Sequence, residues 1–111
     1  MMNMLNNTIQ NLALEFKEKL GERYGERFAK LILYGSYARG NFHEESDVDF
    51  LVVLNDEKVQ NGVEIFFTGD LLNTLSLKYD KLISILPISI RRLQEANSLF
   101  YKNVRQEGIE I

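Results

Sequence analysis

With 111 residues, 45% of them hydrophobic and 26% charged, the chain has the composition of a globular protein, and we expect one domain over residues 1–111. Its apolar runs are too short to cross a membrane, and its formal net charge of −3 argues against long DNA or RNA as a partner. The absence of cysteine excludes disulfides and thiolate metal sites, and without a signal-peptide pattern we expect a cytoplasmic protein.

The first half of the chain predicts a helix and two strands. Apolar residues recur with helical spacing from Leu5 to Tyr24. Short apolar runs predict strands over Phe28 to Tyr34 and over Val48 to Leu54, and the second run is apolar on both faces, as in a central strand. Between the two strands we expect one helical turn over Tyr37 to Gly40 and a polar loop over Asn41 to Ser46.

The second half predicts a longer helix, a third strand and two short helices. The helical pattern over Val63 to Tyr79 contains Gly69, which costs about 1 kcal/mol relative to alanine. Leu82 to Ile88 predicts a strand, with Pro87 near its end or at an edge of the sheet. The remaining elements are a loop over Asn55 to Gly62 and helices over Ser89 to Ala96 and Leu99 to Gln106. This order predicts an α/β (α+β) fold, a small mixed sheet flanked by helices.

Two aspartates stand at the head of the second strand. Side chains alternate along a strand, so Asp47 and Asp49 project to the same side, with Cα atoms about 6.6 Å apart. An Asp-x-Asp taken alone is more often a loop cap followed by a solvated strand residue. Here the pair leads into a strongly apolar strand, where aspartate is disfavoured and two like charges repel unless a cation lies between them. Their hard oxygen ligands suit magnesium, so we predict a metal site at Asp47 and Asp49.

A glycine-serine turn follows the first strand. Gly35 permits a close backbone approach, and Ser36 adds a hydroxyl and an amide, so the turn can wrap a phosphate. A helical turn from Tyr37 would add its N-terminal partial charge, and Arg39 could reach the same phosphate as a permanent cation. The alternative is an ordinary turn with a surface arginine.

The stretch from Gly35 to Asp49 combines Gly-Ser-x-Ala-Arg-Gly, a short acidic loop and Ser-Asp-x-Asp. It resembles the signature of the DNA polymerase β-like nucleotidyltransferase superfamily, and more closely that of the minimal nucleotidyltransferases (MNT), the small partners of HEPN-domain proteins. The resemblance implies a nucleotidyltransferase fold and magnesium-dependent transfer of a nucleoside monophosphate, expected to be AMP from ATP, to a hydroxyl. It implies that Gly35 and Ser36 hold phosphates, that Arg39 assists, and that Asp47 and Asp49 bind the metal.

Members of this family typically carry a third carboxylate on a later strand. That strand has no acid here, so Asp80, just before it, is the candidate, and Ser84 or Leu82 are the alternatives at this position. Two interpretations follow from the resemblance: an antitoxin that adenylylates a hydroxyl of a HEPN toxin, or a module that neutralises the toxin by binding with little catalysis. A transferase acting on a small molecule is a third. A partner protein could complete the pocket, and the chain could also form a homo-oligomer.

Overall fold

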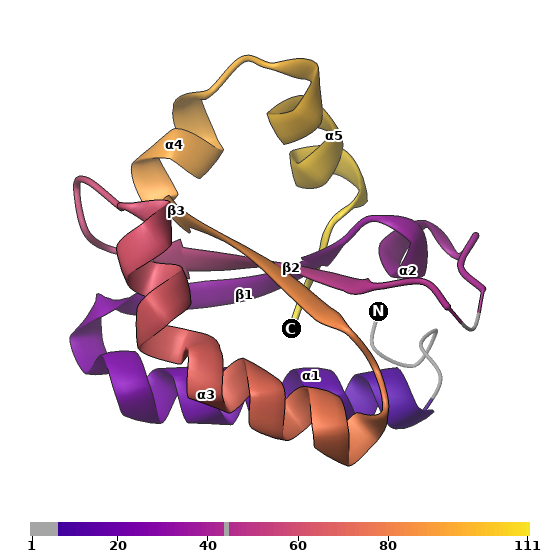
Figure 1. Cartoon of the computed structure of the whole chain (residues 1–111). Helices are drawn as coiled ribbons and strands as arrows, with labels where there is room; N and C mark the ends of the chain where they lie inside the picture. Colours follow the sequence, from indigo (N-terminus) through magenta and orange to yellow (C-terminus); the bar gives the residue numbers. More distant parts are fainter. Residues whose placement is uncertain (1–6, 44) are drawn as a thin grey trace.

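The computed structural model describes residues 7–43 and 45–111. These residues fold into a four-stranded mixed sheet with helices on both faces (Figure 1). The elements in chain order are α1 (Asn7–Tyr24), η2 (Gly25–Arg27), β1 (Phe28–Tyr34), α2 (Ser36–Arg39), β2 (Val48–Leu54), α3 (Asn61–Tyr79), β3 (Ile83–Ser89), α4 (Ile90–Glu95), α5 (Leu99–Glu107) and β4 (Ile109–Glu110). The strand order is β3-β2-β1-β4. β2 is parallel to β3 and antiparallel to β1, and β1 is antiparallel to β4. The predicted fold class is confirmed.

The predicted elements are confirmed with small shifts of their ends. Both predicted strands of the first half have the bounds of β1 and β2. The first helix is described from Asn7, and the start predicted at Leu5 lies outside the described residues. The third strand lies one residue later than predicted, and α3 begins two residues earlier. No helix in the described part of the chain combines the length and apolarity needed to span a membrane.

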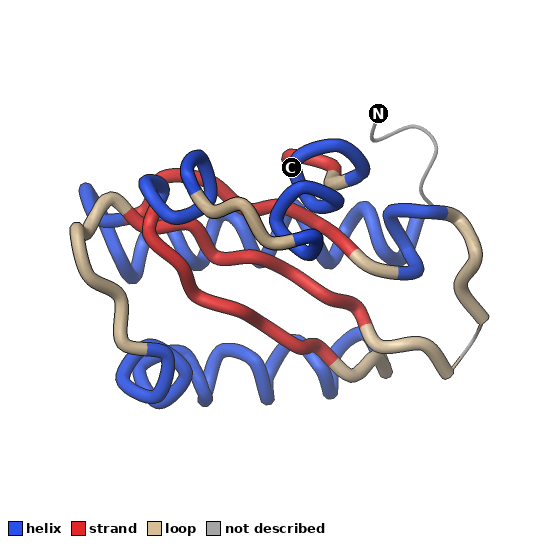
Figure 2. The backbone as a smooth tube through the Cα atoms, turned by 90° about the horizontal axis from the view of Figure 1, so that it is seen from above, coloured by secondary structure: helices blue, strands red, loops and turns tan. Residues whose placement is uncertain are grey.

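β2 lies inside the sheet because it is apolar on both faces. Val48, Phe50 and Val52 pack toward α1 and α3, whereas Leu51 and Val53 pack toward α4 and α5, and all five are fully buried. Complete burial of such a side chain contributes roughly 1.5–3 kcal/mol. Asp49 has the same parity as Leu51, so it projects from the face that carries α4 and α5. Seen from above, these two helices cover only part of that face (Figure 2).

A buried carboxylate fixes the connection from β2 to α3. Glu64, in the first turn of α3, is 5% exposed. It accepts hydrogen bonds from the Tyr24 hydroxyl (2.9 Å) and from Nη2 of Arg27 (2.9 Å), and Arg27 also binds Asp56. Because both carboxylate oxygens are paired, the buried charge is compensated. The network ties the ends of α1 and η2 to the start of α3.

The last strand, β4, is absent from the sequence-based prediction. Its two residues pair with Ile32 and Leu33 of β1, and the Ile111 amide donates to the Leu31 carbonyl (2.9 Å). A two-residue strand is too short to show the alternation by which strands are recognised. Its pairing carries the chain from α5 back to the sheet, so α5 is held over the face that bears Asp49.

β3 is the opposite edge of the sheet. The Val48 amide donates to the Leu82 carbonyl (2.9 Å), so alternate residues of β3 from Leu82 onward turn their backbone groups toward β2. Pro87 lies five residues after Leu82 and therefore turns its nitrogen away from β2. Among the described residues no strand pairs with this outer edge. The prediction of Pro87 at an edge is confirmed.

Gly69→Ala is expected to raise the free energy of unfolding by about 1 kcal/mol, because alanine is the better residue inside a helix. The added methyl group would have no atom within 4 Å. Urea denaturation followed by circular dichroism measures the change.

Gly108→Ala is the matched control. There the same methyl group would lie 2.6 Å from the Val104 carbonyl oxygen and 2.8 Å from Cγ2 of Ile32, so stability should fall. A stabilising effect of Gly108→Ala would contradict the packing of α5 and β4 against β1.

Candidate functional site

The turn after β1 brings the backbone of Gly35 against the carboxylate of Asp49. Tyr34 and Asp49 are register partners in the antiparallel β1–β2 pair, so the next residue, Gly35, stands beside the head of β2. Gly35 has φ 78° and ψ −153°, a region that only glycine adopts readily. A Cβ atom on Gly35 would lie 2.5 Å from Oδ2 of Asp49. Any side chain at position 35 would therefore displace this carboxylate.

The first amides of the short helix α2 lie at the same place, and the described residues provide no side-chain cap for them. The Gly35 carbonyl accepts from the Arg39 amide (3.1 Å), and the Ser36 carbonyl accepts from the Gly40 amide (2.9 Å). The first amides of a helix have no acceptor within it, and Gly35 provides no side-chain cap. Tyr37 is buried and stacks on Phe42 with ring centroids 4.4 Å apart, which anchors the turn. The amide edge of the turn is thus fixed and available to an anion.

Asp47 and Arg39 act electrostatically on Asp49. Partial burial raises the pKa of the Asp49 carboxyl, the negative charge of Asp47 raises it further, and the positive charge of Arg39 opposes both. The sequence-predicted pair and the arginine therefore converge. A partly buried carboxylate beside a second, exposed one is unfavourable by itself, and the pair suits a divalent cation.

The carboxylates of Asp47 and Asp49 fit magnesium, but they provide only two protein ligands. The described residues contain no group of three histidine, cysteine or acidic side chains that could hold a metal ion. Asp47 and Asp49 would thus supply two carboxylates, and the other ligands of an octahedral ion would come from water and from phosphate oxygens.

The guanidinium of Arg39 has no partner among the described residues. The side chains of the other five arginines in the sequence donate to a carboxylate, a hydroxyl or a carbonyl. A small cavity of about 90 Å³ lies beside it. Its lining consists of Tyr34, Gly35, Arg39, Phe100, Asn103, Val104 and Glu107.

Helix α5 lies at the site, which the sequence did not predict. Phe100 contacts Tyr34 edge to face, with centroids 5.5 Å apart, and Asn103 and Glu107 reach the cavity from the same helix. No motif in the sequence connects these residues with Gly35, which lies more than sixty positions earlier. The pairing of β4 with β1 creates the proximity.

The position beside Asp49 on β3 belongs to Ser84. Asp49 and Ser84 are register partners in the parallel pair, so their side chains share a face of the sheet, and Ser84 is exposed. Leu82 lies two residues before Ser84, next to Asp47. Asp80 is the left-handed residue that ends α3, with φ 52° and ψ 47°. Because the described residues contain no three-acid group, a role for Asp80 would require contact with substrate and not with a shared metal ion.

Comparison with known proteins gives a consistent result. A family model described as a nucleotidyltransferase domain matches residues 13–109. Two proteins of Methanocaldococcus jannaschii, which their names mark as provisional protein adenylyltransferases, are 38% identical over 95 residues and 34% identical over 101 residues. The first match covers 85% of this chain and 88% of the relative, and the second covers 87% and 92%.

Two solved structures that contain a chain of similar fold are described as toxin–antitoxin structures. One chain in a toxin–antitoxin structure with AMP-PNP superposes with a TM-score of 0.60 at 22% identity, over 95% of this chain and 72% of that one. A second chain comes from a complex of a tri-AMPylated Shewanella oneidensis HEPN toxin with an MNT antitoxin. It superposes with a TM-score of 0.58 at 17% identity, over 91% of this chain and 69% of that one. At these identities the likeness establishes the fold, and the predicted nucleotidyltransferase fold is confirmed.

Asp49→Asn is expected to raise the midpoint of thermal unfolding by a few degrees in magnesium-free buffer. A carboxyl whose pKa is raised by folding holds its proton more tightly in the folded than in the unfolded state, so its ionised form costs stability at neutral pH. The neutral amide removes this cost. Differential scanning fluorimetry measures the shift.

Asp56→Asn serves as the control, because Asp56 accepts from Nε of Arg27 at 3.0 Å and its neutralisation should lower the midpoint. If both substitutions lowered the midpoint, the unfavourable environment assigned to Asp49 would be wrong.

Proposed function

The chain belongs to the nucleotidyltransferase domain family, and we propose that it transfers the nucleoside monophosphate of a nucleoside triphosphate, first of all AMP from ATP, to a hydroxyl of a partner protein. The observation that carries the proposal is the close approach of the Gly35 backbone to the Asp49 carboxylate, with the unpaired Arg39 at the same place. Phosphate-binding and metal-binding groups are there within reach of one triphosphate.

In the proposed complex the turn holds the phosphates. The first amides of α2 and the Ser36 hydroxyl donate to phosphate oxygens, and the missing side chain of Gly35 leaves room for them beside Asp49. Arg39 adds a planar guanidinium that can donate two parallel hydrogen bonds. Asp47 and Asp49 hold magnesium, which when bound would offset the negative charge that develops on the phosphate oxygens during transfer.

The proposed reaction is an in-line displacement. The oxygen of the acceptor hydroxyl attacks the α-phosphorus, the bond between this phosphorus and the oxygen that bridges to the β-phosphate breaks, and pyrophosphate leaves. The hydroxyl proton passes to water. Ser84 is neutral and stands next to Asp49, so its role is to orient the acceptor hydroxyl by a hydrogen bond. Catalysis then rests on positioning and charge stabilisation.

The proposed acceptor is a HEPN-domain protein. Two similarly folded chains come from toxin–antitoxin complexes, and in one of these complexes the HEPN toxin is tri-AMPylated. By this analogy the chain would act as an antitoxin in the cytoplasm by modifying its toxin. A second candidate function is neutralisation by binding alone. The neutral Ser84 beside Asp49 favours it, because two carboxylates hold a second metal ion less firmly than three.

Asp47→Asn is expected to reduce AMP transfer at least 100-fold while the fold is retained, because a metal-binding charge is lost. The assay incubates the chain with magnesium, α-labelled ATP and the HEPN-domain protein of the same genome, and measures label on the protein. Lys17→Gln, an exposed charge removal on α1, is the control and should transfer at the wild-type rate. A tight complex without label would support the binding module, and neither complex nor label would reject both functions.

Arg39→Lys is expected to raise the Kd for magnesium-ATP roughly tenfold, because lysine keeps the charge but lacks the planar fork of donors. Isothermal titration calorimetry measures the affinity. Arg91→Lys, the same change on the exposed face of α4, should leave the affinity unchanged. An Arg39→Lys variant that binds ATP as tightly as the wild type would remove Arg39 from the proposed site.

A further inference from the structure

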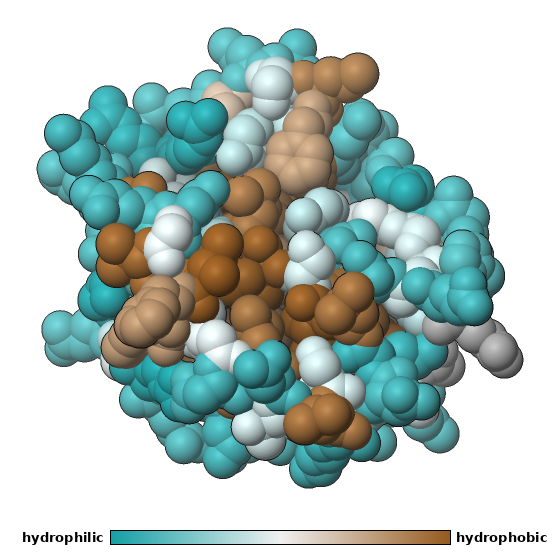
Figure 3. All heavy atoms as spheres, in the orientation of Figure 1, coloured by the Kyte–Doolittle hydropathy of each residue, from teal (hydrophilic) through white to brown (hydrophobic). Residues whose placement is uncertain are grey.

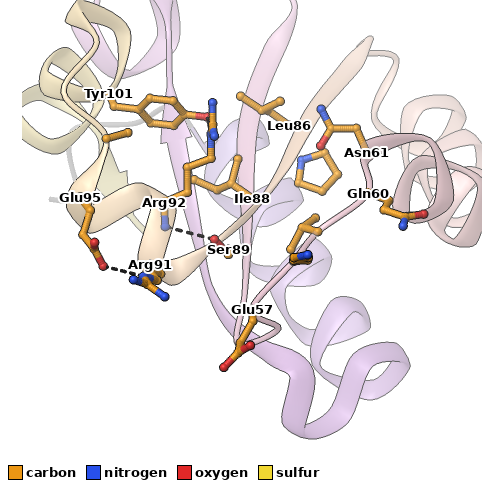
Figure 4. A pocket seen from close by; sticks show the side chains of 14 residues that line it. Glu57, Gln60, Asn61, Leu86, Ile88, Ser89, Arg91, Arg92, Glu95 and Tyr101 are labelled. Carbon is orange, nitrogen blue, oxygen red and sulfur yellow. Dashed lines mark hydrogen bonds and ion pairs between the residues drawn. The ribbon is translucent and has the colours of Figure 1, made fainter.

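A large hollow on the other side of α5 from the small cavity plays no role in the proposed phosphate and metal site. It has a volume of about 1110 Å³ and lies between the loop that leads into α3, the second half of β3, α4 and α5 (Figure 4). We call it the β3 groove. It is lined by Glu57, Lys58, Val59, Gln60, Asn61, Leu86, Pro87, Ile88, Ser89, Arg91, Arg92, Glu95, Ala96 and Tyr101. Its volume is at the upper limit for pockets that hold small molecules.

The β3 groove begins where the candidate site ends. In the β2–β3 ladder Asp49 pairs with Ser84, and two residues further Leu51 pairs with Leu86. Ser84, Leu86 and Ile88 therefore follow one another on the face that carries Asp49. Two residues that follow one another on the same face of a strand are about 6.6 Å apart. The floor of the groove therefore starts at Leu86, about 6.6 Å along β3 from Ser84, the residue beside Asp49.

The free edge of β3 leads into the same groove. Because Leu82 faces β2, the backbone groups of Ile83 and Ile85 turn outward, where no described strand pairs with them. An extended polypeptide can bind such an edge through its main chain. Apolar side chains gather over β3 and α3 on the side of the molecule shown in Figure 3. Among the exposed apolar residues, Leu82 just before β3 is 66% exposed and Phe66 of α3 is 90% exposed.

The lining has a positive rim over an apolar floor. Arg92 donates from Nε to the Tyr101 hydroxyl (3.2 Å) and lies over the Tyr101 ring, so its guanidinium is held at the groove wall. Arg91 pairs with Glu95 on the exposed side of α4, and Lys58 on the opposite rim has no partner among the described residues. The lining thus carries three cations against two carboxylates, although the whole chain has a net charge of −3. The rim favours a segment with acidic residues.

We infer that the β3 groove binds an extended, acidic segment of the acceptor protein and delivers its hydroxyl side chain to Asp49. The inference rests on the proposed function for the identity of the occupant. The inference adds the position of the acceptor segment to the proposed function. The main chain of the segment runs along the outer edge of β3, every second side chain lies over Leu86 and Ile88, and its acidic residues lie at the rim. An acceptor strand at this edge would lie two strand spacings, about 10 Å, from β2, so the geometry suits a long side chain that carries the hydroxyl.

The first test reverses the rim charge with Lys58→Glu and Arg91→Glu together. Transfer rates are measured at increasing concentrations of the HEPN-domain protein, and calorimetry gives its Kd and that of magnesium-ATP. We expect KM and Kd for the protein to rise at least tenfold, with kcat and ATP affinity unchanged. Lys17→Glu with Lys19→Glu, on α1 across the sheet, makes the same charge change and should behave as the wild type. Unchanged KM and Kd in the rim variant would overturn the inference.

The second test addresses the strand edge. Ile85→Pro removes one outward N–H without touching the hydrogen bonds to β2, and Ile85→Ala removes most of the same side chain but keeps the N–H. We expect the proline variant to bind the HEPN-domain protein at least fivefold more weakly than the alanine variant. Equal affinities would overturn the strand pairing.

The two proposals fail separately. If the wild type binds the protein without labelling it, the proposed enzymatic function fails, and the groove is still decided by the affinities of the variants. If label is transferred and the rim variant matches the wild type, only the groove is wrong. If the wild type does not bind the protein at all, the groove proposal is rejected as well.

Discussion

The contact between the Gly35 backbone and the Asp49 carboxylate depends on the register of two strands. Tyr34 opposite Asp49 puts Gly35 next to the acid pair, and the left-handed backbone at Gly35 keeps a side chain out of the space between them. A shift of β2 by one residue would turn Asp49 into the α1 and α3 core and Val48 or Phe50 out of it. Burial of Val48, Phe50 and Val52 therefore stabilises the register and, through it, the site.

The two faces of the sheet contribute differently. α1 and α3 cover one face with a continuous apolar layer that includes Phe16 packed on Phe50, their ring centroids 5.3 Å apart. α4 and α5 cover only part of the other face, where a smaller cluster surrounds Leu51 and Val53. The first face buries the larger apolar cluster, whereas the second leaves Ser84 exposed and holds Asp49 in an environment that disfavours its charge. A partly uncovered face is also what a protein acceptor would need.

The charges of the chain divide between structure and site in the same way. The buried Glu64 is paired with Arg27 and Tyr24, and exposed pairs such as Arg91 with Glu95 satisfy each other. Asp47, Asp49 and Arg39 are arranged differently: the two acids repel each other, and no fixed partner of the Arg39 guanidinium is found in the described chain. Folding alone gains little from such an arrangement, whereas a triphosphate with magnesium would satisfy all three groups. This difference is the physical basis of the proposed function.

The sequence by itself determined the three main strands, the helices and the short motif from Gly35 to Asp49, because periodicity and glycine chemistry act over a few neighbouring residues. For one further position it offered Asp80 as the candidate and Ser84 or Leu82 as alternatives, without deciding among them. Only the tertiary structure decided that Ser84 stands beside Asp49, that β4 brings α5 to the cavity next to Arg39, and that a groove continues along β3. Those relations depend on strand order and register, which come from packing between residues far apart in the chain and leave no local pattern.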